Sequence, residues 1–159
     1  MIINRQRRVR VSIPELEKFL ARVGRRLRIG ARALTVCLVT DAEIARWNRA
    51  YRGKAGPTDV LSFPMDRSER TRGRQNARRW LRREDFAAFP RPSAPYLGDI
   101  AIAPAVARRN ARRFGRTFEE EMRILILHGI LHLMGYDHET DEGQMDRREQ
   151  QLRRALKLS

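Results

Sequence analysis

The three histidines of the chain all lie in one short stretch, His128 to His138, which reads HGILHLMGYDH. His128 and His132 are four residues apart, so on a helix their imidazoles lie on one face and can share one ion. Gly135 favours the left-handed turn that ends many helices, and after such a turn the chain can reverse and bring His138 to the same point. Three imidazole nitrogens with a fourth position left open are typical of a catalytic zinc site. The sequence therefore predicts one Zn²⁺ ion bound by His128, His132 and His138.

The residues around the histidine pair are almost all apolar, which predicts a buried helix. A histidine pair at this spacing, taken alone, is more often two unrelated polar residues than a metal site. The third histidine and the glycine favour the metal interpretation here. Neutral imidazoles suit zinc, although three nitrogens can also bind other divalent ions. The one cysteine, Cys37, is far away in sequence and is most simply a core residue.

The histidine spacing is also similar to the metzincin protease pattern H-E-x-x-H-x-x-G-x-x-H. All three histidines and the glycine match it. Gly129, however, stands where that pattern has its Glu, the general base of peptide hydrolysis. A zinc peptidase is therefore only the third-ranked interpretation.

The composition points to a polyanionic partner. The 159 residues include 34 Lys and Arg against 19 Asp and Glu, a net charge of +15. Such an excess favours nucleic acid first and anionic membrane second, although an arginine-rich surface with no partner is the plain alternative. No secretory signal or membrane-spanning run is apparent, and a single cysteine fits a reducing compartment, so we expect a cytoplasmic protein without a membrane partner.

Segments with the two-residue or β-branched apolar pattern of strands alternate along the chain with segments that have the 3.6-residue apolar period of helices. They predict strands at 2–11, 33–40, 58–64 and 97–103, and helices at 12–24, 41–51, 105–114, 117–134 and 141–156. Capping boxes are expected at Ser12 with Glu15 and at Thr117 with Glu120, and Asp41 is expected to cap the second helix. This order predicts an α/β (α+β) fold, with a small mixed sheet of about four strands, about five helices and the metal site on a buried helix.

Residues 1–159 are expected to form a single domain with an arginine-rich insertion at about 66–96. Eight arginines lie between Arg67 and Arg83. The insertion is either a solvated excursion or an arm that contacts RNA, and the composition favours neither. The polar Thr58, Asp59 and Ser62 could contribute to a site, although their strand could equally serve the core alone.

Four motifs in order carry a family resemblance. HGILHLMGYDH, together with the earlier YRGK, PTDVLSFP and LGDI, resembles the YbeY family of bacterial rRNA maturation factors. The resemblance implies a metal-dependent, single-strand-specific endoribonuclease that acts on the 3′ end of the small-subunit rRNA and in ribosome quality control. It also implies single-stranded RNA and the ribosomal small subunit as partners. The same three histidines would be the zinc ligands.

The resemblance further implies that Arg52, in the YRGK motif, is a catalytic residue near the metal cleft, where it would hold the scissile phosphate. Asp137 and Glu139, beside the third histidine, are possible acceptors for a histidine N–H; for Glu139 the simpler interpretation is the start of the next helix. The alternative to a nuclease is a non-catalytic rRNA-binding assembly factor with a structural zinc ion. The segment at 66–96 is longer and richer in arginine than the family pattern, which leaves the substrate range open.

Overall fold

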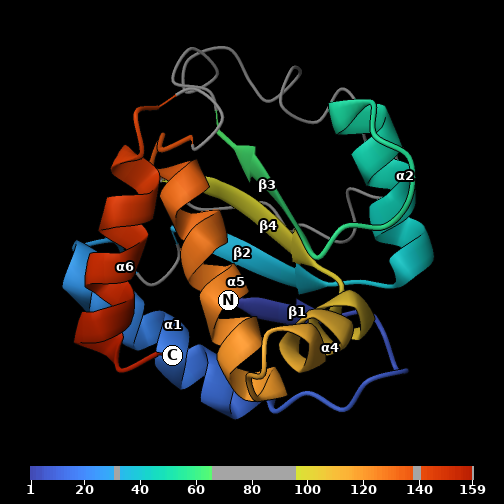
Figure 1. The fold of residues 1–159 in the computed structure, drawn as a ribbon, viewed down its shortest axis with the longest axis horizontal. Helices are drawn as coiled ribbons and strands as arrows, with labels where there is room; N and C mark the ends of the chain where they lie inside the picture. Colours follow the sequence, from blue (N-terminus) through green and yellow to red (C-terminus); the bar gives the residue numbers. More distant parts are fainter. Residues whose placement is uncertain (31–32, 66–95, 138–140, 159) are drawn as a thin grey trace.

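The computed structural model describes residues 1–30, 33–65, 96–137 and 141–158 (Figure 1). Its elements are β1 (Ile2–Asn4), α1 (Ile13–Leu27), β2 (Leu34–Leu38), α2 (Asp41–Arg52), β3 (Val60–Pro64), β4 (Gly98–Ile102), α4 (Pro104–Arg113), α5 (Phe118–Leu133) and α6 (Gln144–Leu156). The predicted fold class is confirmed in this part of the chain. The predicted insertion at 66–96 lies almost wholly outside the described residues, so it remains a prediction.

The strands form one mixed sheet in the order β1-β2-β4-β3. β1 and β4 both run parallel to β2, whereas β3 runs antiparallel to β4 and forms an edge. The edge strand β3 is therefore fixed to the rest of the sheet through β4 alone.

Both faces of the sheet are covered, because successive side chains of a strand point to opposite faces. Leu38 of β2 and Ile100 of β4 belong to the larger core, which α1, α5 and α6 complete. Figure 1 shows α5 lying across the sheet with α6 beside it. The smaller core on the other face brings Trp47 of α2 against Phe63 of β3, with ring centroids 6.3 Å apart. The two helices that carry the predicted site residues, α2 and α5, are thus anchored on opposite faces.

Gly129 allows α5 to lie close to β4. A Cβ atom added at Gly129 would come within 2.9 Å of two side-chain carbons of Ile100. The position that holds a general base in the metzincin pattern therefore faces the sheet and is filled by the core. A longer side chain there would have to displace Ile100, which is costly in a close-packed interior.

The structure confirms only part of the strand predicted at the start of the chain. The opening strand is Ile2–Asn4 alone, shorter than the predicted 2–11. The next residues form a turn instead, in which the Gln6 side chain accepts from Val9 N at 2.8 Å and donates to Val9 O at 2.9 Å. These bonds give the backbone an alternative to strand pairing.

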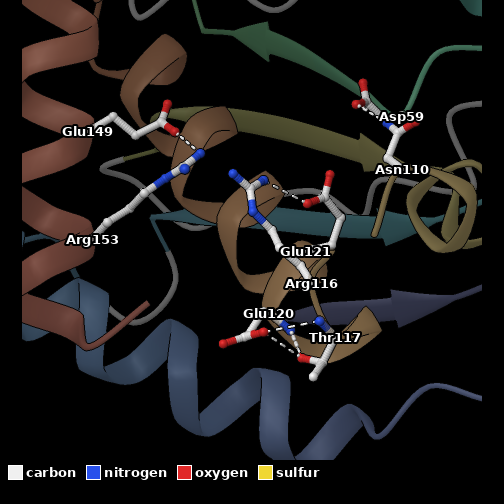
Figure 2. Close-up of polar contacts among 8 residues, drawn as sticks. All are labelled: Asp59, Asn110, Arg116, Thr117, Glu120, Glu121, Glu149 and Arg153. Carbon is white, nitrogen blue, oxygen red and sulfur yellow. Dashed lines mark hydrogen bonds and ion pairs between the residues drawn. The ribbon is translucent and has the colours of Figure 1, made fainter. Parts of the chain in front are cut away.

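The caps of three helices show which predicted cap interactions form. Thr117 and Glu120 make the predicted capping box at the start of α5 (Figure 2). The box predicted at the start of α1 is wrong, because Ser12 is the N-cap residue but its side chain makes no cap hydrogen bond. The predicted cap at Asp41 is also wrong by one residue: Thr40 is the N-cap and forms a full box with Glu43. A Glu three residues on selects Thr40, since Asp41 lacks that partner.

Cys37 is expected to resist thiol reagents in the native protein. Its side chain is fully buried in β2, and this burial raises the pKa of the thiol to about 12. Because the thiolate is the reactive species, the native thiol should not react with an aromatic disulfide reagent at pH 8 until denaturant is added. Stoichiometric labelling within the mixing time without denaturant would contradict the burial of Cys37.

Candidate metal centre and its cleft

The last two turns of α5 present two histidines from an otherwise buried helix. Residues 129–131 and 133 are buried, whereas His128 and His132 are partly exposed. Their Nε2 atoms lie 3.1 Å apart and their ring centroids 4.8 Å apart. The helical spacing predicted from the sequence therefore does bring the two imidazoles together.

Glu149 of α6 orients the first histidine. Its Oε2 atom lies 2.7 Å from Nδ1 of His128, and its other oxygen accepts a hydrogen bond from Arg153 (Figure 2). A carboxylate can only accept, so the hydrogen bond places a proton on Nδ1 and turns Nε2 toward His132. Burial raises the pKa of Glu149, but the hydrogen bond and charge of His128 and the charge of Arg153 outweigh this effect, so that the pKa is lowered overall.

The donor set fits a zinc ion. A carboxylate behind an imidazole is the usual support for a metal-binding histidine, because it fixes the tautomer and raises the basicity of the other nitrogen. Two zinc–nitrogen bonds of about 2.0–2.1 Å at a tetrahedral angle place their nitrogens about 3.3 Å apart. The 3.1 Å separation of the two Nε2 atoms is close to that value.

The third predicted ligand, His138, lies outside the described residues, as does Glu139. Within the described ranges no group of three or more His, Cys, Asp or Glu side chains is placed to hold an ion. The three-histidine set thus remains a prediction, of which the structure places two members.

The histidine pair lines a cleft with a volume of about 480 Å³. The other lining residues come from the end of α2, from β3 with the residues before it, and from the turn after α5: Tyr51, Arg52, Thr58, Asp59, Val60, Leu61, Ser62, Pro64, Gly135, Tyr136 and Asp137. The three polar residues singled out in the 58–64 segment therefore all lie in this cleft. Asp137 does as well.

Arg52 is the last residue of α2, and Gly53 ends the helix in the left-handed conformation with a φ of 68°. The Arg52 side chain is exposed and borders the cleft that also contains the histidines. Beside it, the Tyr51 ring packs on Phe63 with centroids 5.0 Å apart. Burial raises the pKa of Tyr51, an effect that the neighbouring Arg52 partly offsets. A tyrosine phenol is protonated at neutral pH, so Tyr51 can donate a hydrogen bond to a ligand in the cleft that it lines.

Asp59 has a structural role in the cleft wall. Its Oδ1 atom accepts from Val60 N at 2.8 Å and from the Thr58 hydroxyl at 3.2 Å. Its Oδ2 atom accepts from Asn110 of α4 at 2.9 Å (Figure 2). These bonds fix the start of β3 against α4.

Sequence reasoning missed Glu149. It lies between apolar residues at helical spacing, in the stripe Met145, Glu149, Leu152 and Leu156, all of which are buried. A carboxylate inside an apolar stripe is a signal that it has a buried partner. The sequence therefore marked Glu149 as unusual, but it did not identify His128 as the partner.

Comparisons with known proteins agree with the resemblance of the four motifs. The family model described as endoribonuclease YbeY matches residues 1–157. An endoribonuclease YbeY of Solibacter usitatus is 39% identical over 91% of this chain and 80% of its own length. One of Koribacter versatilis is 39% identical over 99% of this chain and 86% of its own length.

A solved structure shares the fold. The solution structure of a Thermotoga maritima protein superposes with a TM-score of 0.58 at 28% identity, covering 98% of this chain and 89% of that one. Within the described ranges, no helix combines the length and apolar character needed to span a membrane. The match over residues 1–157 and the curated relatives show that the chain belongs to the endoribonuclease YbeY family, a family of hydrolases that act on RNA.

Proposed function

We propose that this chain is a zinc-dependent, single-strand-specific endoribonuclease of the cytoplasm that acts in rRNA maturation, notably at the 3′ end of the small-subunit rRNA, and in ribosome quality control. The observation that carries the proposal is the convergence of the two Nε2 atoms, supported by Glu149, in a cleft that Arg52 borders. Family membership supports RNA as the substrate.

His128, His132 and His138 would hold the ion in this proposal. A bound zinc ion would supply Lewis acidity toward a phosphoryl oxygen and acidify an attacking water. Arg52 would bind the scissile phosphate through two parallel N–H donors and stabilise its developing charge. The protonated Tyr51 phenol, at the same wall, would donate to a further phosphate oxygen.

The shape of the site supports single-strand specificity. The histidines project from a helix that is packed firmly against the sheet. The RNA must therefore enter the cleft to reach the metal site, because the site does not move toward the RNA. A flexible single strand can bend into the cleft and present its phosphate to both walls, whereas a stiff A-form duplex cannot.

The test is cleavage of a labelled single-stranded RNA by the purified protein, with the same RNA annealed to its complement as the control. We expect the single strand to be cut and the duplex to be cut at least about tenfold more slowly. Stripping the metal with a chelator should stop cleavage, and added Zn²⁺ should restore it. If the zinc-loaded protein binds RNA but does not cut it, the nuclease proposal is wrong and an rRNA-binding assembly role is favoured.

Glu149→Gln is expected to lower zinc affinity about 10- to 100-fold, because the amide no longer provides the charged acceptor that orients His128. Competition with a chromophoric zinc chelator measures this directly. Asp146→Asn is the matched control: it makes the same carboxylate-to-amide change on an exposed residue of the same helix. Equal zinc affinities for the two variants would show that Glu149 does not support the metal site.

A further inference from the structure

A second hollow, shallow and open to solvent, borders the metal cleft at Tyr136. It has a volume of about 460 Å³ and is lined by Tyr136, Gln144, Arg147, Arg148 and Gln151. Tyr136 lines this hollow and also the cleft that contains the histidines. The two depressions therefore share one wall, and an extended chain that leaves the metal cleft across Tyr136 enters the second hollow.

The floor of this second hollow is one face of α6. Its four α6 residues are spaced i, i+3, i+4 and i+7, so they lie side by side on the helix surface. Two are arginines and two are glutamines, and none is a carboxylate. The face is therefore positively charged. Its arginine and glutamine side chains suit a polyanion that also carries polar groups.

Both arginines are held against the helix. Arg147 Nη1 donates to the Glu142 carbonyl at 3.1 Å, and Arg148 Nη1 donates to the Gln151 side chain at 2.6 Å. Each of these bonds uses one of the five N–H donors of its guanidinium, so donors remain to bind a phosphate. Restrained side chains lose less entropy on binding than mobile ones.

Tyr136 provides a fixed aromatic surface between the two depressions. Its side chain is half-buried and packs against the larger core, and its backbone N–H donates to Leu131 O at 3.1 Å. Aromatic rings of this kind bind single-stranded nucleic acid because every base has a face that can stack, whereas duplex bases are already stacked.

We propose that the second hollow is an RNA-binding subsite, in which a base of the single strand stacks on Tyr136 and the following phosphates bind Arg147 and Arg148. The inference rests on the proposed function, since it extends the path of the same substrate beyond the metal cleft. It adds a second source of single-strand preference, because only an unpaired base can stack on Tyr136.

Binding is measured by fluorescence anisotropy with single-stranded 2′-O-methyl RNA of about 4 and about 12 nucleotides, and a gel run after each titration checks that the probe is uncut. For the longer probe, the double variant Arg147→Gln/Arg148→Gln should raise Kd about tenfold near 0.15 M salt. It should also reduce the slope of log Kd against log salt by about 1.4, the value for two lost phosphate contacts to a single strand. The shorter probe can make fewer of these contacts, so its Kd should differ less between the two proteins.

The control is Arg112→Gln/Arg113→Gln, which lowers the net charge of +15 by the same two charges. These exposed residues end α4, next to the start of α5 and about 20 Å along that helix from His132. The control should keep a salt slope close to the wild-type value. Tyr136→Leu should raise Kd for the longer probe about five- to tenfold, and Tyr136→Trp should restore it, because stacking needs a ring.

The outcomes separate this subsite from the proposed activity. If the Arg147/Arg148 variant and the Arg112/Arg113 control have the same Kd and the same salt slope, the subsite is wrong even if the protein cuts RNA. If the expected differences in binding appear but the zinc-loaded wild type cuts no RNA, the subsite is supported and the nuclease proposal fails.

Discussion

His132→Ala is expected to reduce cleavage of single-stranded RNA by about 10³-fold or more, because it removes one of the two Nε2 atoms that converge at the proposed metal centre. Deleting one imidazole leaves His128 and the predicted His138, too few protein ligands for a tight zinc site. Zinc affinity and cleavage should therefore fall together.

The variant should remain folded. His132 is partly exposed in α5, and alanine is a good helix former, so the substitution creates no buried cavity. Thermal unfolding with the metal removed from both proteins should give similar midpoints. Glu119→Ala is the matched control, since it changes an exposed residue in the first turn of the same helix to alanine. It should cut RNA at nearly the wild-type rate.

Cleavage rate and zinc affinity together locate the activity. If His132→Ala loses zinc and also loses cleavage while Glu119→Ala retains both, the histidine pair is part of the nuclease centre. If His132→Ala loses zinc but still cuts RNA at the wild-type rate, the reaction occurs elsewhere or comes from a contaminant. That result would reject the proposed mechanism.

Local interactions explain which parts of the fold the sequence could predict. Thr117 and Glu120 of the capping box are three residues apart and the two histidines are four apart, so each pair can be recognised from about one turn of a helix. The strands and helices follow from periodicities of the same short range. In contrast, nothing local indicates that β3 pairs antiparallel with β4, because that pairing depends on how the whole sheet buries its two faces.

The site shows the same division between local and long-range interactions. Glu149 lies 21 residues after His128, and their pairing depends on how α6 packs against α5. Arg52 belongs to α2, which is packed on the opposite face of the sheet from α5, so spacing alone could not place it near the histidines. Its link to the site came from the family resemblance, and the structure now places it at the edge of the same cleft.

Gly98→Ala is expected to destabilise the fold by on the order of 4 kcal/mol, from backbone strain and overpacking together. Gly98 has a φ of 146°, a conformation that side chains rarely allow. An added Cβ would lie 2.3 Å from the carbonyl oxygen of Phe63 and 2.8 Å from Cδ2 of Leu133. The first contact is with backbone, so a side-chain rotation cannot relieve it.

Urea and thermal unfolding measure this effect. A loss of about 4 kcal/mol is a large part of the usual 5–15 kcal/mol of a domain, and it corresponds to a fall in Tm of about 8–16 °C at this chain length. Gly30→Ala is the matched control, because no atom of the described residues lies within 4 Å of an added Cβ there and φ is not positive. The control should unfold within about 0.5 kcal/mol of the wild type.

The consequence of Gly98→Ala should extend to the site. Gly98 pairs with Pro64 at the end of β3, and Leu133, which it contacts, follows His132 directly. Any shift that relieves the clash therefore moves β3 or the end of α5, which form two walls of the metal cleft. We expect the variant that remains folded to bind zinc less tightly than the wild type at a temperature well below its Tm. If the variant had wild-type stability and zinc affinity, the packing of β3, β4 and α5 around Gly98 would have to be less tight than it is in the structure.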